Sequence, residues 1–156
     1  MPQRFSLYGD LTVMENLRFY SDIYQVPADV REEKIKYLLE FSRLKKHSDK
    51  LADQLSGGMK QKLAIISAWL HEPQLIIMDE PFVGLDHKAS HLLKEMMRAF
   101  CDYGGAIFFS THVLEVAEKL CDKVAIIKGG KLIRQGTMDE VKGDESLEDV
   151  FLELEE

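Results

Sequence analysis

The chain has 156 residues, 46% of them hydrophobic, which is enough for one domain with a real core. Its formal charge is −7 and its Lys and Arg residues are scattered, which argues against a nucleic-acid-binding surface because phosphate neutralisation needs clustered cations. Cys101 and Cys121 lack metal-ligand spacing and no secretory signal is evident, so we expect a reduced, intracellular protein. No apolar run approaches the roughly 18 residues of a membrane span, so membrane association would require a partner.

The charge-rich N-terminal part of the chain has helical patterns. Thr12 and Glu15 have the spacing of a capping box, in which each side chain satisfies a backbone N–H of the other residue, and this predicts a helix over residues 13–24. Residues 29–32 repeat that spacing and predict a second helix starting there. Strand signals are scarce in this region, so we expect residues 11–58 to form an α-helical subdomain.

The pattern changes to that of an α/β domain over residues 59–156. Continuous apolar runs at residues 75–78 and 106–110 predict two strands, the first of them covered on both faces. An amphipathic helix between them completes the strand-helix-strand unit of a parallel sheet. Glycines 129 and 130 predict a tight hairpin between two further strands. Helices are expected over residues 60–70, 89–100, 113–120 and 146–156.

A short glycine-rich turn precedes a predicted helix and consists of Ser56, Gly57 and Gly58. Unpaired N–H groups and the positive end of the helix dipole favour an anion at such a position. Two consecutive glycines let a phosphate approach the backbone closely. The same three residues also fit an ordinary helix start with a flexible turn.

Two acidic residues, Asp79 and Glu80, follow the first predicted strand, and His112 follows the second. Ligands of open α/β sheets bind at the carboxyl ends of the strands. A carboxylate there suits Mg²⁺, and a neighbouring one is placed to polarise an attacking water as a general base. A core strand followed by two solvated acids, and a surface histidine, are the plainer interpretations. His47, His71, His87 and His91 have no such context and are interpreted as surface residues.

Taken in order, these segments resemble the ATPase domain of ABC transporters. Residues 55–62 read Leu-Ser-Gly-Gly-Met-Lys-Gln-Lys, which resembles the ABC signature, and residues 84–86 read Gly-Leu-Asp, which resembles the D-loop. Gln3 stands upstream of residues 11–17, Leu-Thr-Val-Met-Glu-Asn-Leu, as in the family's Q-loop pattern. The resemblance extends to the Ser-Leu-Glu-Asp-Val-Phe sequence at residues 146–151.

The resemblance implies an α/β P-loop NTPase fold, with a partial RecA-like parallel sheet and an α-helical subdomain. It also implies ATP and Mg²⁺ as cofactors, and ATP hydrolysis coupled to transport. The implied partners are a second ABC ATPase subunit, which forms a dimer across ATP, and a transmembrane permease subunit. The implied location of this chain is cytoplasmic, peripheral on the cytoplasmic face of the membrane. The implied site residues are Glu80 as general base, His112 as switch histidine, Asp79 and Gln3 at Mg²⁺, Ser56, Gly57 and Gly58 at the γ-phosphate, and Asp86 in the D-loop.

The ending of the chain and Met59 in the signature look most like ATPase subunits of ABC-2-type exporters for drugs, antibiotics or polysaccharide-like cargo. Phe82 stands where many members have Thr, and His87 where many have Pro; neither change removes a catalytic group. No G-x-x-x-x-G-K-[ST] phosphate loop occurs in the 156 residues. We therefore expect the C-terminal part of such a domain, without the Lys and backbone cradle that hold ATP.

Two other functions remain open from the sequence. The chain fits a non-catalytic module that docks on a partner ATPase or membrane subunit. A soluble ABC ATPase of DNA maintenance or translation is disfavoured by the acidic charge and by the lack of a coiled-coil insertion before Ser56. In either case, missing strands of the sheet would expose apolar faces, so we expect the isolated chain to be poorly soluble or partly molten.

Overall fold

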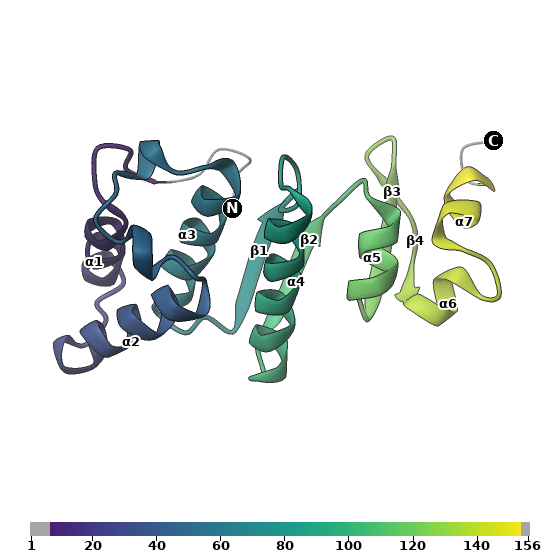
Figure 1. The fold of residues 1–156 in the computed structure, drawn as a ribbon. Helices are drawn as coiled ribbons and strands as arrows, with labels where there is room; N and C mark the ends of the chain where they lie inside the picture. The colour runs from purple at the N-terminus through teal and green to yellow at the C-terminus, as the bar shows by residue number, and fades with distance from the viewer. Residues whose placement is uncertain (1–6, 154–156) are drawn as a thin grey trace. The chain divides into compact units, whose positions relative to one another are not determined.

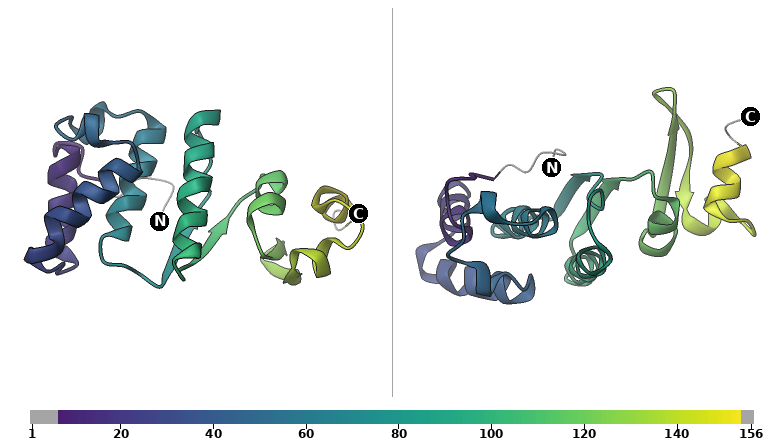
Figure 2. Two further views of the ribbon diagram at one scale, coloured as in Figure 1. Left: turned by 60° about the horizontal axis from the view of Figure 1, so that its bottom comes forward. Right: turned by 45° about the horizontal axis from the view of Figure 1, so that its top comes forward.

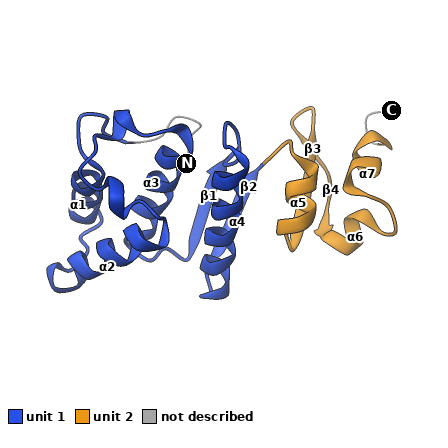
Figure 3. Cartoon of the chain, in the orientation of Figure 1, with its two compact units in different colours: residues 1–110 blue, residues 111–156 orange. Residues whose placement is uncertain are grey.

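The computed structural model describes residues 7–153, and the chain divides between Ser110 and Thr111 into two compact units (Figure 3). The first unit carries α1 (Val13–Ile23), α2 (Ala28–Phe41), the short 3₁₀ helices η1 (Lys45–His47) and η2 (Ala52–Gln54), α3 (Gly57–Trp69), β1 (Leu75–Asp79), α4 (His87–Asp102) and β2 (Ala106–Ser110) (Figure 1). The second carries α5 (Leu114–Leu120), β3 (Lys123–Lys128), β4 (Lys131–Thr137), α6 (Met138–Lys142) and α7 (Leu147–Glu153). The predicted division into residues 11–58 and 59–156 stays a prediction.

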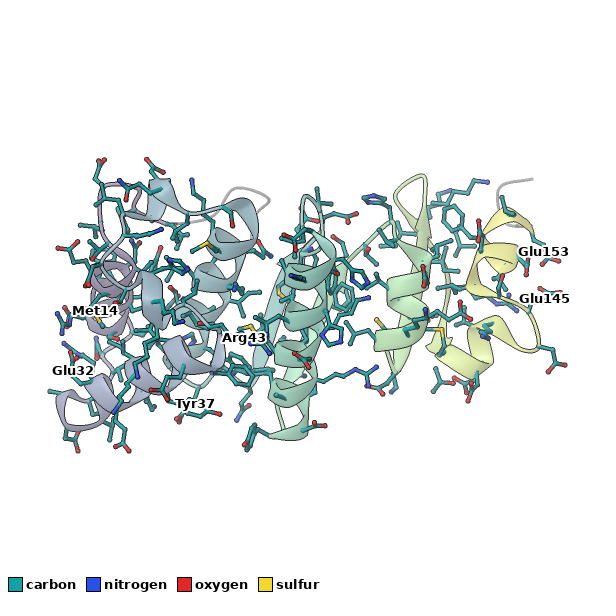
Figure 4. All side chains as sticks on the ribbon, viewed as in Figure 1. Met14, Glu32, Tyr37, Arg43, Glu145 and Glu153 are labelled. Atoms are coloured by element: carbon teal, nitrogen blue, oxygen red, sulfur yellow. The ribbon has the colours of Figure 1, made fainter. Side chains whose placement is uncertain are left out.

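The first helix begins with the predicted capping box. The Thr12 hydroxyl accepts the Glu15 N–H at 3.1 Å, and the Glu15 carboxylate accepts the Thr12 N–H at 2.7 Å. The capping box predicted for residues 29–32 is wrong, because α2 begins earlier, with Pro27 as an N-cap that makes no side-chain cap bond. The fixed φ of proline already suits a helix entrance. Glu32 instead pairs with Arg18 of α1 at 3.0 Å, on the exposed side of α2 (Figure 4).

The core of the first unit lies between helices that pack through apolar side chains. Contacts join α1 to α2 and α3, and α3 to α4. Helix α3 begins at Gly57, three residues before the predicted start, because Ser56 caps it. Apolar side chains with no more than 1% exposure form this core: Val13, Leu17, Ile35, Leu44, Ala52, Leu63, Ile66, Leu70, Leu93 and Met96.

Strands β1 and β2 form the predicted parallel pair, in register from Leu75 opposite Ala106 to Asp79 opposite Ser110. Helix α4 connects them and runs along one face of the pair (Figure 2). The prediction that β1 is covered on both faces is wrong for the described residues: Ile76 is 6% exposed, whereas Ile77 is 57% exposed. Phe108 of β2 is 62% exposed as well. The described part of the chain supplies a covering layer to one face only, so an apolar face remains accessible.

The second unit is a hairpin packed against short helices. Strands β3 and β4 pair antiparallel, and Gly129 and Gly130 connect them with φ of 57° and 75°, as the glycine pair predicts. Helix α6 was not predicted; it begins with a capping box between Thr137 and Glu140. Buried apolar side chains from the helices and the hairpin form the core: Ala117, Ile126, Val141, Leu147 and Val150. Across residues 7–153, no helix is both long enough and apolar enough to cross a bilayer.

Candidate functional site

The carboxyl ends of β1 and β2 bring an acidic pair and a hydroxyl together. Asp79, the last residue of β1, pairs with Ser110, the last residue of β2. The Ser110 hydroxyl donates to Asp79 Oδ1 at 2.5 Å and accepts the backbone N–H of Glu80 at 3.0 Å. Asp79 is exposed and Glu80 is half-buried. Both acidic residues therefore stand at the edge of the sheet where ligands of α/β proteins bind.

The backbone of Glu80 adopts an unusual conformation. Its φ is 45°, in the left-handed region that non-glycine residues rarely occupy. The chain then turns, with the Val83 N–H donating to the Glu80 carbonyl at 3.2 Å, and passes Gly84 at φ 75° on its way to Asp86. Strained conformations of this kind persist where surrounding structure holds them, and they concentrate at functional sites.

The signature-like segment forms the start of α3. Ser56 is the N-cap, and its Oγ accepts the Met59 N–H at 3.3 Å. Because the oxygen acts as the acceptor in that bond, the hydroxyl keeps its proton for donation to an outside acceptor. Ser56 and Gly57 are exposed. The open end of a helix of 13 residues, with its free N–H groups, is suited to an anion such as phosphate.

The start of α3 lies directly against the start of α4. A Cβ added to Gly58 would lie 2.8 Å from the Cβ of Ala89, so only glycine fits that approach. Asp86 caps α4, its Oδ1 accepting the Ala89 N–H at 2.7 Å. Burial lowers the pKa of Lys62 on α3, as does nearby Arg43, whereas Asp86 opposes the shift. The signature-like and D-loop-like segments are thus held together by packing within one unit.

The structure does not test the roles of two predicted site residues. Gln3 lies outside the described residues, so its role stays a prediction. His112 belongs to the second unit, where it is exposed, and its proximity to Glu80 also stays a prediction.

Two polar residues that sequence reasoning passed over are prominent in the structure. Ser110 entered the prediction only as the last residue of the strand expected over residues 106–110. Its bonds to the Asp79–Glu80 pair depend on a strand register that pairs residues 31 positions apart. Asn16 is fully buried and bonds to the backbone of Tyr8, Leu11 and Thr12. A polar residue placed among apolar helix positions was the available signal for Asn16.

The donor set at the sheet edge fits a magnesium ion held jointly with a phosphate ligand. Among residues 7–153 there is no group of three His, Cys, Asp or Glu side chains that could hold a metal ion. Asp79 offers hard carboxylate oxygens, and Mg²⁺ is commonly held by one or two carboxylates together with water and substrate phosphates. The protein residues that would hold the ion are Asp79 and, by prediction, Gln3.

Comparisons with known proteins show the family of this chain. A family model described as "ABC transporter" matches residues 1–83. The Nod factor export ATP-binding protein I of Rhizobium etli is 39% identical over 152 residues, covering 95% of this chain and 48% of the relative. Its counterpart from Ralstonia nicotianae is 38% identical over 141 residues, covering 90% of this chain and 44% of the relative. The chain thus spans about half the length of these curated relatives.

Solved structures show the same fold. An ATP-binding subunit of an ABC transporter superposes with a TM-score of 0.89 at 36% identity, over 99% of this chain and 67% of that one. The cbiO1 protein of Clostridium perfringens, part of the ABC transporter complex cbiONQ, superposes with a TM-score of 0.76 at 27% identity, over 87% of this chain and 54% of that one. The chain therefore belongs to the ABC transporter family and has the α/β P-loop NTPase fold of ABC ATPases.

Proposed function

We propose that this chain supplies three parts of an ATP-hydrolysing subunit of an ABC-2-type exporter. They are the signature, the switch histidine, and the acidic pair Asp79 and Glu80, which we call the Walker B carboxylates. One observation carries the proposal: the helix start at Ser56–Gly58 and the D-loop-like turn at Asp86 are packed together in the unit that also presents Asp79 and Glu80 at a sheet edge. The likeness to Nod factor export proteins supports an export role for drug, antibiotic or polysaccharide-like cargo.

In the proposed site, each residue has one task. The Ser56 hydroxyl and the N–H groups of Gly57 and Gly58 bind the γ-phosphate of an ATP held by a second copy. Glu80 accepts a proton from the attacking water. The remaining roles are binding ones: Asp79 and Gln3 hold Mg²⁺, His112 donates to a γ-phosphate oxygen, and Asp86 lies at the dimer interface. When bound, Mg²⁺ neutralises charge on the phosphates.

Export follows from closing and opening of the dimer. Two subunits enclose two ATP molecules at the cytoplasmic face of the membrane. Closure of the dimer moves a transmembrane permease through the region near residues 4–50. The permease selects the cargo. Turnover also needs a phosphate loop, which the 156 residues do not contain, so hydrolysis is proposed for the complete subunit.

The test is Mg-ATP turnover of the intact gene product, with and without Glu80→Gln. Loss of the general base should lower turnover by about 10²- to 10⁴-fold while ATP still binds. Glu95→Gln is the matched control, because Glu95 is an exposed acid on α4 whose ion pair with His91 is on the surface. Equal turnover by wild type and Glu80→Gln would contradict the proposed chemistry.

A second candidate is a non-catalytic module that offers Ser56–Gly58 to the ATP of a partner. The intact mass of the endogenous protein distinguishes the two. A mass well above the 17.9 kDa of this chain would favour a complete ATPase subunit. A mass equal to that of this chain, together with no Mg-ATP turnover, would favour the module.

A further inference from the structure

We propose that Ser110 is a positioning residue of the ATPase site, which holds the Asp79 carboxylate and the Glu80 backbone in one fixed arrangement through a single hydroxyl. The inference rests on the proposed function, because it assigns Asp79 and Glu80 to Mg²⁺ and the attacking water. It concerns a residue to which the signature, D-loop and switch motifs give no task.

The register of β1 and β2 places Ser110 beside Asp79. Asp79 and Ser110 are the last pair of the parallel ladder, so their side chains leave the sheet at the same end. Both residues are exposed. A hydroxyl beside the carboxylate at this position is therefore a consequence of the register of β1 and β2, which pairs all five residues of each strand.

The directions of the two hydrogen bonds are fixed by chemistry. A carboxylate can only accept, and a backbone N–H can only donate. The one hydroxyl proton of Ser110 therefore goes to Asp79 Oδ1, at 2.5 Å, and an oxygen lone pair receives the Glu80 N–H, at 3.0 Å. The carboxylate is held through Oδ1, which leaves Oδ2 to a further ligand. Rotation of the Asp79 carboxylate would break the bond to Oδ1.

The hydrogen bond from the Glu80 N–H to the Ser110 hydroxyl concerns the proposed general base, Glu80. Glu80 has φ of 45°, a conformation that costs a non-glycine residue free energy and persists only where its surroundings hold it. The Ser110 hydroxyl binds the N–H of that residue directly. Loss of the hydroxyl would release the backbone from which the Glu80 side chain projects and the carboxylate of Asp79 at once. Misplacement of a catalytic group by about 1 Å can cost about 10²-fold in rate.

The chain contains a matched control for a merely structural hydroxyl. Ser146, at the start of α7, makes the same two kinds of bond: its Oγ donates to Asp149 Oδ2 at 2.6 Å and accepts the Asp149 N–H at 3.1 Å. Ser146→Ala removes an equivalent hydroxyl from a helix start that has no role in the proposed site. Ser110→Thr keeps the hydroxyl, on a side chain that suits a strand.

The first experiment measures amide hydrogen exchange at Glu80 in the intact, nucleotide-free gene product. Ser110→Ala should speed exchange of the Glu80 amide by about tenfold, because the substitution removes the hydrogen bond that this amide donates. Ser110→Thr and Ser146→Ala should leave that exchange rate near the wild-type value. An unchanged exchange rate in Ser110→Ala would overturn the inference, because the hydroxyl would then not hold Glu80.

The second experiment measures steady-state kinetics and the affinity for Mn²⁺ as a magnesium substitute, the latter by electron paramagnetic resonance with ADP bound. Ser110→Ala should lower kcat by about 10- to 100-fold with little change in KM for Mg-ATP, and should weaken Mn²⁺ binding. Ser110→Thr should restore both, and Ser146→Ala should change neither. Normal kcat and Mn²⁺ affinity in Ser110→Ala would overturn the positioning role. Absence of turnover in the wild type would contradict the proposed function instead, while the exchange measurement still decides whether Ser110 holds Glu80.

Discussion

Replacing Asn16 by Ala should destabilise the first unit more than any exposed substitution on the same helix. Asn16 is fully buried on α1, and its side chain binds the segment that precedes the helix. Its Oδ1 accepts the Tyr8 N–H at 2.9 Å. Its Nδ2 donates to the carbonyls of Tyr8, Leu11 and Thr12 at 3.0, 3.1 and 2.9 Å. This one amide therefore fixes the turn that follows the predicted Q-loop residue.

The size of the expected destabilisation depends on which hydrogen bonds the partner groups of Asn16 keep after the substitution. The carbonyls of Tyr8, Leu11 and Thr12 also accept the backbone N–H groups of Leu11, Ala52 and Asn16 itself, at 3.2, 2.9 and 2.9 Å, so none of them is orphaned. Nδ2 has two hydrogens, so the side chain makes about three full bonds, each worth about 1 kcal/mol net. We expect Asn16→Ala to lower the free energy of unfolding by about 3 kcal/mol.

The assay is denaturant unfolding of the intact gene product, with hydrogen exchange to locate the change. Ser21→Ala is the matched control, because Ser21 is fully buried on the same helix and makes a single side-chain bond to the Leu17 carbonyl at 2.8 Å. It should cost about 1 kcal/mol. If Asn16→Ala were no more destabilising than Ser21→Ala, the extra hydrogen bonds of Asn16 would contribute nothing to stability, contrary to this prediction.

Three further predictions concern packing, reactivity and pH. Gly58→Ala should lower the free energy of unfolding by about 1–3 kcal/mol in denaturant titrations, because the new Cβ would lie 2.8 Å from that of Ala89; an unchanged midpoint would show that the contact gives way easily. Burial raises the pKa of the Cys121 thiol to about 11 from 9.0, so alkylation at about pH 8 should be about 100-fold slower in the folded protein than in the unfolded one, and equal rates by mass spectrometry would contradict this. Hydrogen bonds from Thr137, the backbone one first, lower the pKa of Glu140 below its usual 4.5, so its stabilisation is fully present above that pH and is lost as the pH falls through the folded-state pKa. Glu140→Gln should reduce the acid dependence of unfolding, measured from about pH 6 to about pH 3, and an identical pH profile would refute that assignment.

Helix starts could be predicted from local sequence patterns, but whether each pattern formed a cap depended on the neighbouring residues. The capping box at Thr12 and Glu15 formed as expected, since both bonds lie within one turn. The same spacing at residues 29–32 failed, because the preceding Pro27 already starts the helix. Helix α6 was missed because a helix of five residues has too few positions for an apolar period.

Features that depend on distant residues were harder to predict. The apolar run of β1 indicated burial on both faces, yet burial depends on what covers each face, and Ile77 is exposed in the described part of the chain. The link from Ser110 to Asp79 requires the strand register, which no local pattern specifies. By contrast, the motifs predicted the family and the fold class correctly, because each motif is a short run of neighbouring residues that can be recognised without knowledge of the fold.

The proposed function requires that two copies enclose ATP between the carboxylates of one copy and the signature of the other. The direct test is the mass in solution of the intact Glu80→Gln protein, by light scattering, with and without ATP. We expect an ATP-dependent dimer that Ser56→Asp abolishes, because a negative charge at the helix start would repel the γ-phosphate. A protein that binds ATP and remains monomeric, or a dimer indifferent to Ser56→Asp, would contradict the claim.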